Sequence, residues 1–194
     1  MMNKWDRIYS CAELRDYPAA AVLVDNAFLL PESGTALDLA SGLGSNALFL
    51  AERGFDTQAW DQSGVAMEKL QRQADFRNLP VKAMVKNICN EVFINCAFDV
   101  IIVSRFLNRE LAHAIIAALN PDALLFYQTY TREKTTRKGP GNPDFLLAEN
   151  ELLRMFSPLR IVYYRENGRF GDISHGLRNE AQLIAAKRSF APTT

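Results

Sequence analysis

The sequence has no long apolar run and no apolar segment near its start. No stretch approaches the ~18 consecutive apolar residues that a membrane-spanning helix needs. The first residues, Met1–Arg7, are polar and of mixed charge, unlike a signal peptide. These absences argue against a membrane anchor and against an export signal. We therefore expect a cytoplasmic protein without a membrane partner.

Net charge and cysteine are also scarce. Lys+Arg and Asp+Glu number 22 each, which gives a formal net charge of +0, whereas a protein built to hold nucleic acid usually shows a basic face. The three cysteines, Cys11, Cys89 and Cys96, are odd in number and lack the spacing of metal ligands. We expect no nucleic-acid partner, no metal site, and free thiols.

What is present is an ordinary globular composition. Hydrophobic residues make up 48% of the 194 residues, which excludes wholesale disorder and predicts a single domain over residues 1–194. Residues 1–31 are expected to form a helical lead-in that ends at Pro31. Within it, Trp5 and Tyr9 either form a lid over a substrate or pack the lead-in onto the rest of the domain.

The chain is organised around one strand–turn–helix segment. Thr35–Leu39 has the pattern of a short buried strand, and it carries an acid, Asp38. In the turn that follows, Gly42 and Gly44 can adopt positive φ and let a ligand approach the backbone. A helix then begins, with Ser45 as its expected N-cap. Strand, glycine turn and helix in this order form the first crevice of a nucleotide-binding α/β sheet.

Strands and helices alternate along the chain, which predicts an α/β fold with a doubly wound, seven-stranded, mostly parallel sheet. The expected strands are Thr35–Leu39, Asp56–Trp60, Val81–Val85, Phe98–Val103, Ala123–Thr129, Leu159–Arg165 and Glu180–Lys187. The expected helical segments are Trp5–Tyr17, Ala19–Leu30, Ser45–Ala51, Ser63–Arg77, Glu110–Leu119 and Glu149–Phe156. About a dozen residues, rich in glycine, join the last two strands. That is too few for a crossover helix, so a C-terminal antiparallel hairpin is expected.

Two acids beside the glycine turn indicate which nucleotide the crevice would bind. Gly42-x-Gly44-x-x-Ala47 also fits a dinucleotide site, but only weakly. Asp38 places an anion beside the ligand, which suits the ammonium and sulfonium of S-adenosylmethionine (SAM) and would repel a pyrophosphate. Asp61 stands where an acid accepts hydrogen bonds from ribose hydroxyls, in NAD and SAM sites alike. The alternatives are that Asp38 caps local backbone groups and that Asp61 is an acid at a helix N-terminus.

Five segments carry a family resemblance. Residues 38–50 have the sequence Asp-Leu-Ala-Ser-Gly-Leu-Gly-Ser-Asn-Ala-Leu-Phe-Leu, and the others are Trp5-Asp6, Ala59–Asp61, Phe98–Leu107 and Asn142–Leu147. Together they resemble class I SAM-dependent methyltransferases, in the branch similar to tellurite-resistance (TehB-like) methyltransferases. The resemblance covers nearly all of the chain. It is specific for fold and cofactor and much less so for substrate.

By this resemblance the glycine turn would hold the methionine part of SAM and the acid after the second strand its ribose. The end of the third strand would flank the adenine, and the end of the fourth would close the pocket. The implied cofactor-binding residues are Asp38, Ala40, Ser41, Gly42, Gly44, Asn46, Asp61, Gln62, Asn87, Ile88, Ser104 and Arg105. Ala40 stands where the motif usually has its first glycine, which is a mild change if this residue has an ordinary φ. Asn87 replaces a common aspartate, and its carbonyl can still accept the adenine amino group.

The resemblance implies a SAM-dependent methyltransferase that acts on a small molecule, as a monomer or a homodimer. No Asp–His or Glu–His pairing is visible in the sequence, so no catalytic residue is assigned. We therefore expect a soft (S, Se or Te) or already anionic acceptor, which needs no base. The alternative is a catalytically silent SAM-binding protein or sensor of the same fold, supported by Asn87 and by the irregular residues 86–96.

Three further features are ambiguous. The loop over residues 130–144 is long and basic, so it is either a lid that attracts an anionic acceptor or a solvated surface loop. Arg105 would pair with an anionic substrate or with an acid of the N-terminal segment. His113 is expected to pack within its helix, and His175, in the last loop, is a weak candidate for a base.

Overall fold

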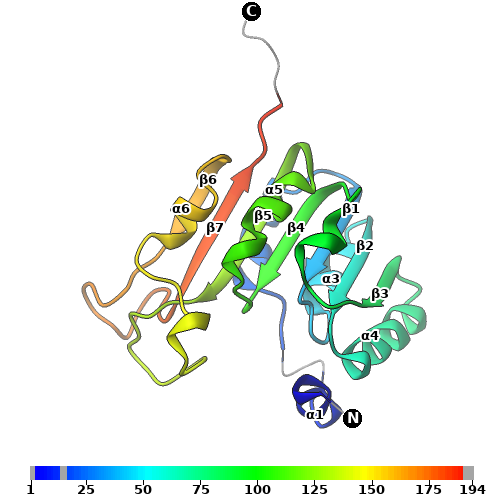
Figure 1. Cartoon of the computed structure of the whole chain (residues 1–194), viewed down its shortest axis with the longest axis horizontal. Coiled ribbons are helices and arrows are strands. Elements are labelled where there is room, and N and C mark those ends of the chain that lie inside the picture. Colours follow the sequence, from blue (N-terminus) through cyan, green and yellow to red (C-terminus); the bar gives the residue numbers. More distant parts are fainter. Residues whose placement is uncertain (1–2, 14–16, 190–194) are drawn as a thin grey trace, which may run out of the picture.

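Seven strands form one sheet in the computed structural model, which describes residues 3–13 and 17–189. The strands are β1 (Gly34–Leu39), β2 (Phe55–Asp61), β3 (Val81–Val85), β4 (Phe98–Ser104), β5 (Leu119–Tyr130), β6 (Arg160–Arg165) and β7 (Glu180–Ala186). Their order across the sheet is β3-β2-β1-β4-β5-β7-β6. The first five strands are mutually parallel, and β7 runs antiparallel to β5 and β6 (Figure 1). The predicted sheet is confirmed.

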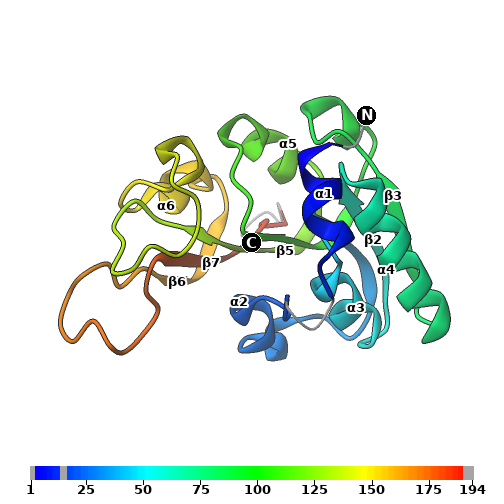
Figure 2. The same cartoon turned by 90° about the horizontal axis from the view of Figure 1, so that it is seen from below.

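Helices cover both faces of this sheet. The α-helices are α1 (Lys4–Ser10), α2 (Ala21–Val24), α3 (Ser45–Ala51), α4 (Gly64–Phe76), α5 (Ala112–Ala117) and α6 (Glu151–Met155). Short 3₁₀ turns are η2 (Ala27–Leu29), η3 (Asn90–Phe93), η4 (Arg109–Leu111) and η5 (Pro143–Phe145). Figure 2 shows α2 and α3 on one side of the sheet and α5 and α6 on the other. None of the helices in the described ranges has the length and apolar character that crossing a bilayer demands.

The central strand β4 shows why the sheet is covered on both sides. Val100 and Ile102 pack against residues of α2 and α3, whereas Ile101 and Val103 pack on the opposite face with Trp60. All five side chains are fully buried. A parallel strand buried on both faces requires such a continuous apolar run. Burial of each side chain contributes roughly 1.5–3 kcal/mol relative to leaving it exposed.

The connection between the two antiparallel C-terminal strands is held by one arginine. Residues 166–179 connect β6 to β7 and contain no helix. The guanidinium of Arg178 donates hydrogen bonds to backbone carbonyls of this connection, those of Asn167, Gly168, Phe170, Asp172 and His175. The connection therefore folds as a compact loop around one side chain, and the predicted hairpin is confirmed.

The predicted helix over Ala19–Leu30 is wrong in its extent. The structure has only the single turn α2, followed by the 3₁₀ turn η2. The side chain of Asn26 donates to the carbonyl of Val22 at 3.0 Å, which is the group that a continuing α-helix would bond through its backbone. Asparagine competes with helix formation in this way.

Two other boundaries differ from the sequence prediction. The helix expected from Glu110 begins as the 3₁₀ turn η4, and β5 already starts at Leu119, with an irregular register next to Pro121. Proline lacks a backbone donor, so it is tolerated in a strand at such an irregularity. The lead-in helix ends at Ser10, and residues 14–16 of the expected Trp5–Tyr17 helix lie outside the described residues.

Two neighbouring strands are each followed by a residue of positive φ. Ala40 follows β1 with φ 56° and Arg105 follows β4 with φ 54°. A residue with a Cβ pays roughly 1–2 kcal/mol in this left-handed region. The condition under which Ala40 would be a mild replacement for glycine is therefore not met.

Ala40→Gly should stabilise the protein. Removal of the Cβ relieves the left-handed strain, while the greater freedom of glycine in the unfolded chain offsets part of the gain, leaving roughly 0.5–1 kcal/mol. Urea denaturation measures the change. Ala36→Gly, in the extended part of β1, is the matched control and should destabilise. Equal destabilisation by both substitutions would show that Ala40 is unstrained.

Candidate functional site

The predicted site residues meet along one edge of the sheet. The four neighbouring strands β3, β2, β1 and β4 each bring one feature to this edge. Asn87 lies just after β3, Asp61 ends β2, the glycine turn follows β1, and Ser104 ends β4. The carboxyl edge is where sheets of this type bind ligands. The structure thus brings all of the predicted segments together.

The glycine turn after β1 is folded by backbone hydrogen bonds. The N–H of Ser41 donates to the carbonyl of Trp60 on β2 (3.1 Å), and that of Gly44 donates to the carbonyl of Ser41 (2.9 Å). Gly42 has φ +54°, and a Cβ there would lie 2.7 Å from the hydroxyl of Tyr9. A side chain at this position would be strained by its positive φ and would displace the Tyr9 hydroxyl, so the turn favours glycine.

Asp61 connects the glycine turn to α4. Its Oδ2 accepts the N–H of Gly42 at 2.8 Å, and its Oδ1 accepts the N–H of Ser63 at 2.9 Å. Burial raises the pKa of this carboxyl, and the two N–H donors counteract the rise. Ser63 is the N-cap of α4, as predicted, and accepts the N–H of Ala66. Asp61 is therefore an acid at a helix N-terminus, and each of its oxygens retains a lone pair for a further donor.

Asp38 is fully buried and caps the start of α3. Its Oδ1 accepts Nδ2 of Asn46 at 3.3 Å, and its Oδ2 accepts the N–H of Ala47 at 3.0 Å. Burial raises the pKa of Asp38 to about 7, even though both hydrogen bonds act to lower it. Of the two roles considered for this acid, the described residues show the capping role. Contact with a ligand ammonium stays a prediction.

The two serines of the turn use their hydroxyls differently. The expectation that Ser45 caps α3 is wrong, because the N-cap is Gly44 and the Ser45 hydroxyl donates to the carbonyl of Tyr17. The Oγ of Ser41 is buried and lacks a hydrogen-bond partner, alone in this respect among side-chain polar atoms of the described residues. A buried hydroxyl left unpaired costs about 1–3 kcal/mol. This atom therefore marks a place that suits a polar ligand group.

The remaining predicted residues line the same edge. The N–H of Lys86 donates to the carbonyl of Asp61 at 2.8 Å, which holds the exposed Asn87 close to the acid. The site residues Gln62 and Ser104 lie at the ends of β2 and β4, and Ile88 packs partly into the core. Arg105 is exposed and forms no ion pair with the residues that the structure describes. No acid of the described part of the N-terminal segment therefore pairs with Arg105, and contact with an anionic substrate stays a prediction.

Helix α1 lies across the glycine turn and the start of α4 (Figure 2). Nδ2 of Asn3 donates to the carbonyl of Gln62 at 3.2 Å. The carboxylate of Asp6 accepts the hydroxyl of Ser63 at 2.7 Å, and Tyr9 covers Gly42 as described above. The N-terminal helix is thus packed directly on the residues that flank Asp61.

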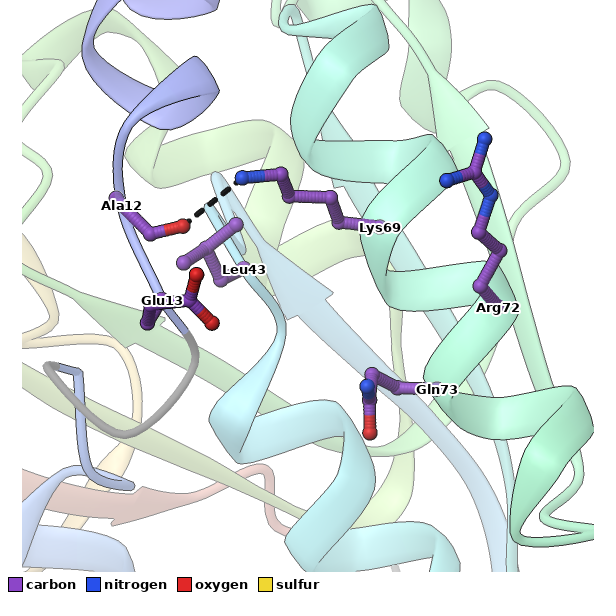
Figure 3. A pocket seen from close by; sticks show the side chains of 6 residues that line it. All are labelled: Ala12, Glu13, Leu43, Lys69, Arg72 and Gln73. Carbon is purple, nitrogen blue, oxygen red and sulfur yellow. Dashed lines mark hydrogen bonds between the residues drawn. The ribbon is translucent and has the colours of Figure 1, made fainter.

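Lys69 on α4 fastens the end of α1. Its Nζ donates to the carbonyls of Tyr9 (2.8 Å), Ser10 (3.1 Å) and Ala12 (2.9 Å), and a cation at a helix C-terminus is favourable. Figure 3 shows the bond to Ala12 at the wall of a hollow of about 220 Å³, lined by Ala12, Glu13, Leu43, Lys69, Arg72 and Gln73. Of the two roles considered for the lead-in, packing is the one that these contacts show.

Sequence reasoning missed several contacts. The hydrogen bonds of Asp6 and Lys69 join segments about sixty residues apart, and no local sequence pattern predicts them. Asp172 and His175 form an Asp–His pair at 2.8 Å that was not visible in the sequence, and both side chains are largely exposed in the last loop. The expectation that His113 packs within its helix is wrong, because His113 is exposed.

Within the described ranges, no group of three or more His, Cys, Asp or Glu is arranged to hold a metal ion.

Asp38→Asn should stabilise the protein more at neutral than at acidic pH. The folded carboxyl keeps its proton up to about pH 7, whereas the unfolded one releases it near its ordinary value of 3.8. The folded state therefore binds more protons between these values, and the stability of the unsubstituted protein falls as pH rises through this window. The difference in unfolding free energy should move in favour of the variant by up to ~1.4 kcal/mol per pH unit. Urea denaturation across the window checks this, and a pH-independent difference would contradict it.

Lys69→Met should release α1. Three carbonyls lose their cationic donor, so stability should fall by about 1–2 kcal/mol, and amide hydrogen exchange in residues 4–12 should accelerate. Arg72→Met is the matched control, since Arg72 lies on the same helix and pairs with Glu68 at the surface. Unchanged exchange in the Lys69 variant would mean that α1 is held by other contacts.

The chain is similar to known proteins in sequence. It matches the family described as "Tellurite resistance protein TehB" over residues 21–181. It is 29% identical over 137 residues to "Probable S-adenosyl-L-methionine-dependent methyltransferase TehB" of Haemophilus influenzae, a match that covers 68% of this chain and 48% of that protein. The chain thus spans about half the length of the curated relatives it matches.

Solved structures show the same fold. The crystal structure of TehB from Haemophilus influenzae has a TM-score of 0.73 at 23% identity and covers 95% of this chain and 68% of that one. A SAM-dependent methyltransferase from Aquifex aeolicus has a TM-score of 0.70 at 16% identity, covering 95% of this chain and 98% of that one. At such identities the likeness concerns the fold alone. The family match, in contrast, extends over most of the chain, and this chain therefore belongs to the TehB family.

Proposed function

We propose that this protein is a SAM-dependent methyltransferase that acts on a small molecule. Family membership supports the reaction class. The observation that carries the proposal is the contact between the Gly42 N–H and the Asp61 carboxylate, because it joins the glycine turn to an acid suited to a ribose. Both groups lie at the ligand-binding edge of the sheet.

The residues present fit SAM. The buried Ser41 hydroxyl lacks a partner, and Gly42 has no side chain to obstruct the methionine part. Asp61 would accept the ribose hydroxyls with its remaining lone pairs, and Asn87 would accept the adenine amino group. When bound, SAM supplies a methyl group that is already activated by the sulfonium.

The task of the protein is then mainly alignment. Holding acceptor and methyl donor in line can supply ~7–11 kcal/mol of the barrier reduction. Asp38 fixes the start of α3 and thereby the shape of the turn, and α1 covers the turn and would exclude water from it. Because α1 is short and is fastened at its end by Lys69, its release would admit the cofactor.

The acceptor that we propose is soft (S, Se or Te) or anionic. The loop after β5 supports attraction of an anion, since Arg132, Lys134, Arg137 and Lys138 lie on it and it has little regular structure. The loop is held within its length, because Oδ1 of Asn179 accepts the N–H groups of Thr135 and Thr136 at 2.7 and 3.1 Å. As a lid, the loop would move about this contact and close over the acceptor.

SAM and S-adenosylhomocysteine should raise the melting temperature, and NAD should not. Asp61→Ala should weaken SAM binding by roughly 1.5–3 kcal/mol, because hydrogen bonds to a charged group are lost. Calorimetry measures this at a temperature where the variant is folded, since the variant also loses the acceptor for Gly42 and Ser63. Asp56→Ala, an exposed position on the same strand, should bind SAM normally.

Two results would count against the proposal. Tight binding of NAD with no heat of binding from SAM would show that SAM is not the cofactor. Unchanged affinity of Asp61→Ala for SAM would mean that another acid holds the ribose. Turnover of SAM to S-adenosylhomocysteine with a panel of acceptors separates a methyltransferase from a silent SAM-binding protein or sensor.

A further inference from the structure

A line of hydrogen bonds crosses the interior between β6, β7 and β5. The hydroxyl of Tyr163 donates to Oε1 of Gln182 (3.2 Å), and Nε2 of Gln182 donates to Oε1 of Gln128 (3.0 Å). Nε2 of Gln128 donates in turn to Oε2 of Glu180. Gln128, Gln182 and Glu180 are all buried, an environment in which charged side chains are rare unless they are paired.

One backbone group sets the direction of this line. The N–H of Val22 donates to Oε1 of Gln128 at 2.9 Å, so this atom is the carbonyl oxygen and the amide nitrogen of Gln128 faces Glu180. The Gln182 atom that contacts the same oxygen must then be its nitrogen. Every hydrogen in the line therefore points towards Glu180. Hydrogen bonds aligned in this way polarise one another, which strengthens the bond that Glu180 accepts.

Glu180 lies at the same edge of the sheet as the candidate site. It is the first residue of β7 and pairs with Tyr130, the last residue of β5. Burial raises the pKa of the Tyr130 hydroxyl, with Arg105 lowering it and Glu180 raising it further. Tyr130 thus has both Arg105, at the end of β4, and Glu180 as charged neighbours.

The same backbone segment donates to the glycine-turn region and to the line of hydrogen bonds that ends at Glu180. The N–H of Ala20 donates to Oδ1 of Asn46 at 2.8 Å, and the N–H of Val22 donates to Gln128. Asn46 also contacts Asp38. Two backbone N–H groups at the start of α2 therefore connect the proposed cofactor turn to the glutamine that holds Glu180.

The charge of Glu180 is not balanced within the described part of the chain. The amide of Gln128 is the sole side-chain donor to it there, and no lysine, arginine or histidine of that part forms an ion pair with it. A buried carboxylate normally has a cation or several donors. Its Oε1 is left to receive a donor from a ligand or from water.

We propose that Glu180 binds the nucleophilic group of the methyl acceptor and that this group carries a hydrogen, as S–H, O–H or N–H. The inference rests on the proposed methyltransferase function and narrows it. An anionic acceptor would face an uncompensated negative charge at Glu180, whereas a protic acceptor would satisfy Oε1. Of the soft acceptors considered above, a thiol or selenol meets this requirement.

The step balances without any further reactant. An electron pair on the sulfur, oxygen or nitrogen of the acceptor forms the new bond to the methyl carbon. The bond between that carbon and the sulfonium breaks, and its electron pair stays on sulfur to give S-adenosylhomocysteine. The hydrogen of the acceptor passes as a proton to Oε1 of Glu180 and then to solvent. Glu180 thereby supplies the base that sequence reasoning did not find.

Glu180→Gln separates this role from a structural one. The new carboxamide has nearly the same size and still offers an oxygen to Gln128, so the line that supports α2 is kept and only the charge is lost. Glu32→Gln is the matched control, because Glu32 is an exposed acid in the turn before β1. Both variants should bind S-adenosylhomocysteine like the unsubstituted protein.

The experiment uses the full chain saturated with S-adenosylhomocysteine, which cannot react, and three probes: ethanethiol, phenol and selenite. At least one protic probe should bind by calorimetry, and Glu180→Gln should weaken it at least tenfold, while Glu32→Gln changes nothing. With SAM in place of S-adenosylhomocysteine, methylation of that probe should show at least a tenfold lower kcat in Glu180→Gln. Selenite should bind no better to the unsubstituted protein than to Glu180→Gln.

Several results would overturn the proposal. These are equal affinity of Glu180→Gln for the protic probes, binding of neither protic probe to the unsubstituted protein, and selenite binding that exceeds theirs. If S-adenosylhomocysteine itself does not bind, the proposed function fails as well. If it binds and Glu180 has no effect on the probes, the methyltransferase proposal stands and only the role of Glu180 is lost.

Discussion

The hydrogen bond from the Gly42 N–H to the Asp61 carboxylate is the contact on which the candidate site depends. It joins the turn after β1 to the end of β2. The second oxygen of Asp61 holds the start of α4, and α4 carries Lys69, which fastens α1 back over the same turn. A single buried acid thus connects the turn, a helix and the cover. Burial makes such a bond stronger and makes its loss more costly.

The parts of the fold that sequence reasoning predicted are those set by local patterns. The continuous apolar run of β4 predicts a central strand, and the short glycine-rich stretch before Glu180 predicts the hairpin. The glycine turn and Asp61 are likewise visible, because the strand, turn and helix that place them are contiguous in sequence. These features need no knowledge of which distant segments touch.

What sequence reasoning missed depends on contacts between distant residues. The helix after Ala19 stops because the Asn26 side chain takes the Val22 carbonyl, and Asp38 becomes a buried cap only once α3 is packed on β1. The positive φ of Ala40 depends on how the turn is bonded to β2. The line that ends at Glu180 exists only because β5 pairs with β7, and no local pattern contains that pairing.

The placement of β7 has a consequence for how the chain folds. β7 comes last of the seven strands in sequence, yet it lies between β5 and β6. Until it inserts, β5 presents an open edge of backbone donors and acceptors, which is a template for pairing with other chains. The first five strands form through short crossovers, whereas this insertion closes a long loop and is intrinsically slow. The same event brings Glu180 to Gln128, so protection of the sheet edge and completion of the carboxylate environment occur together.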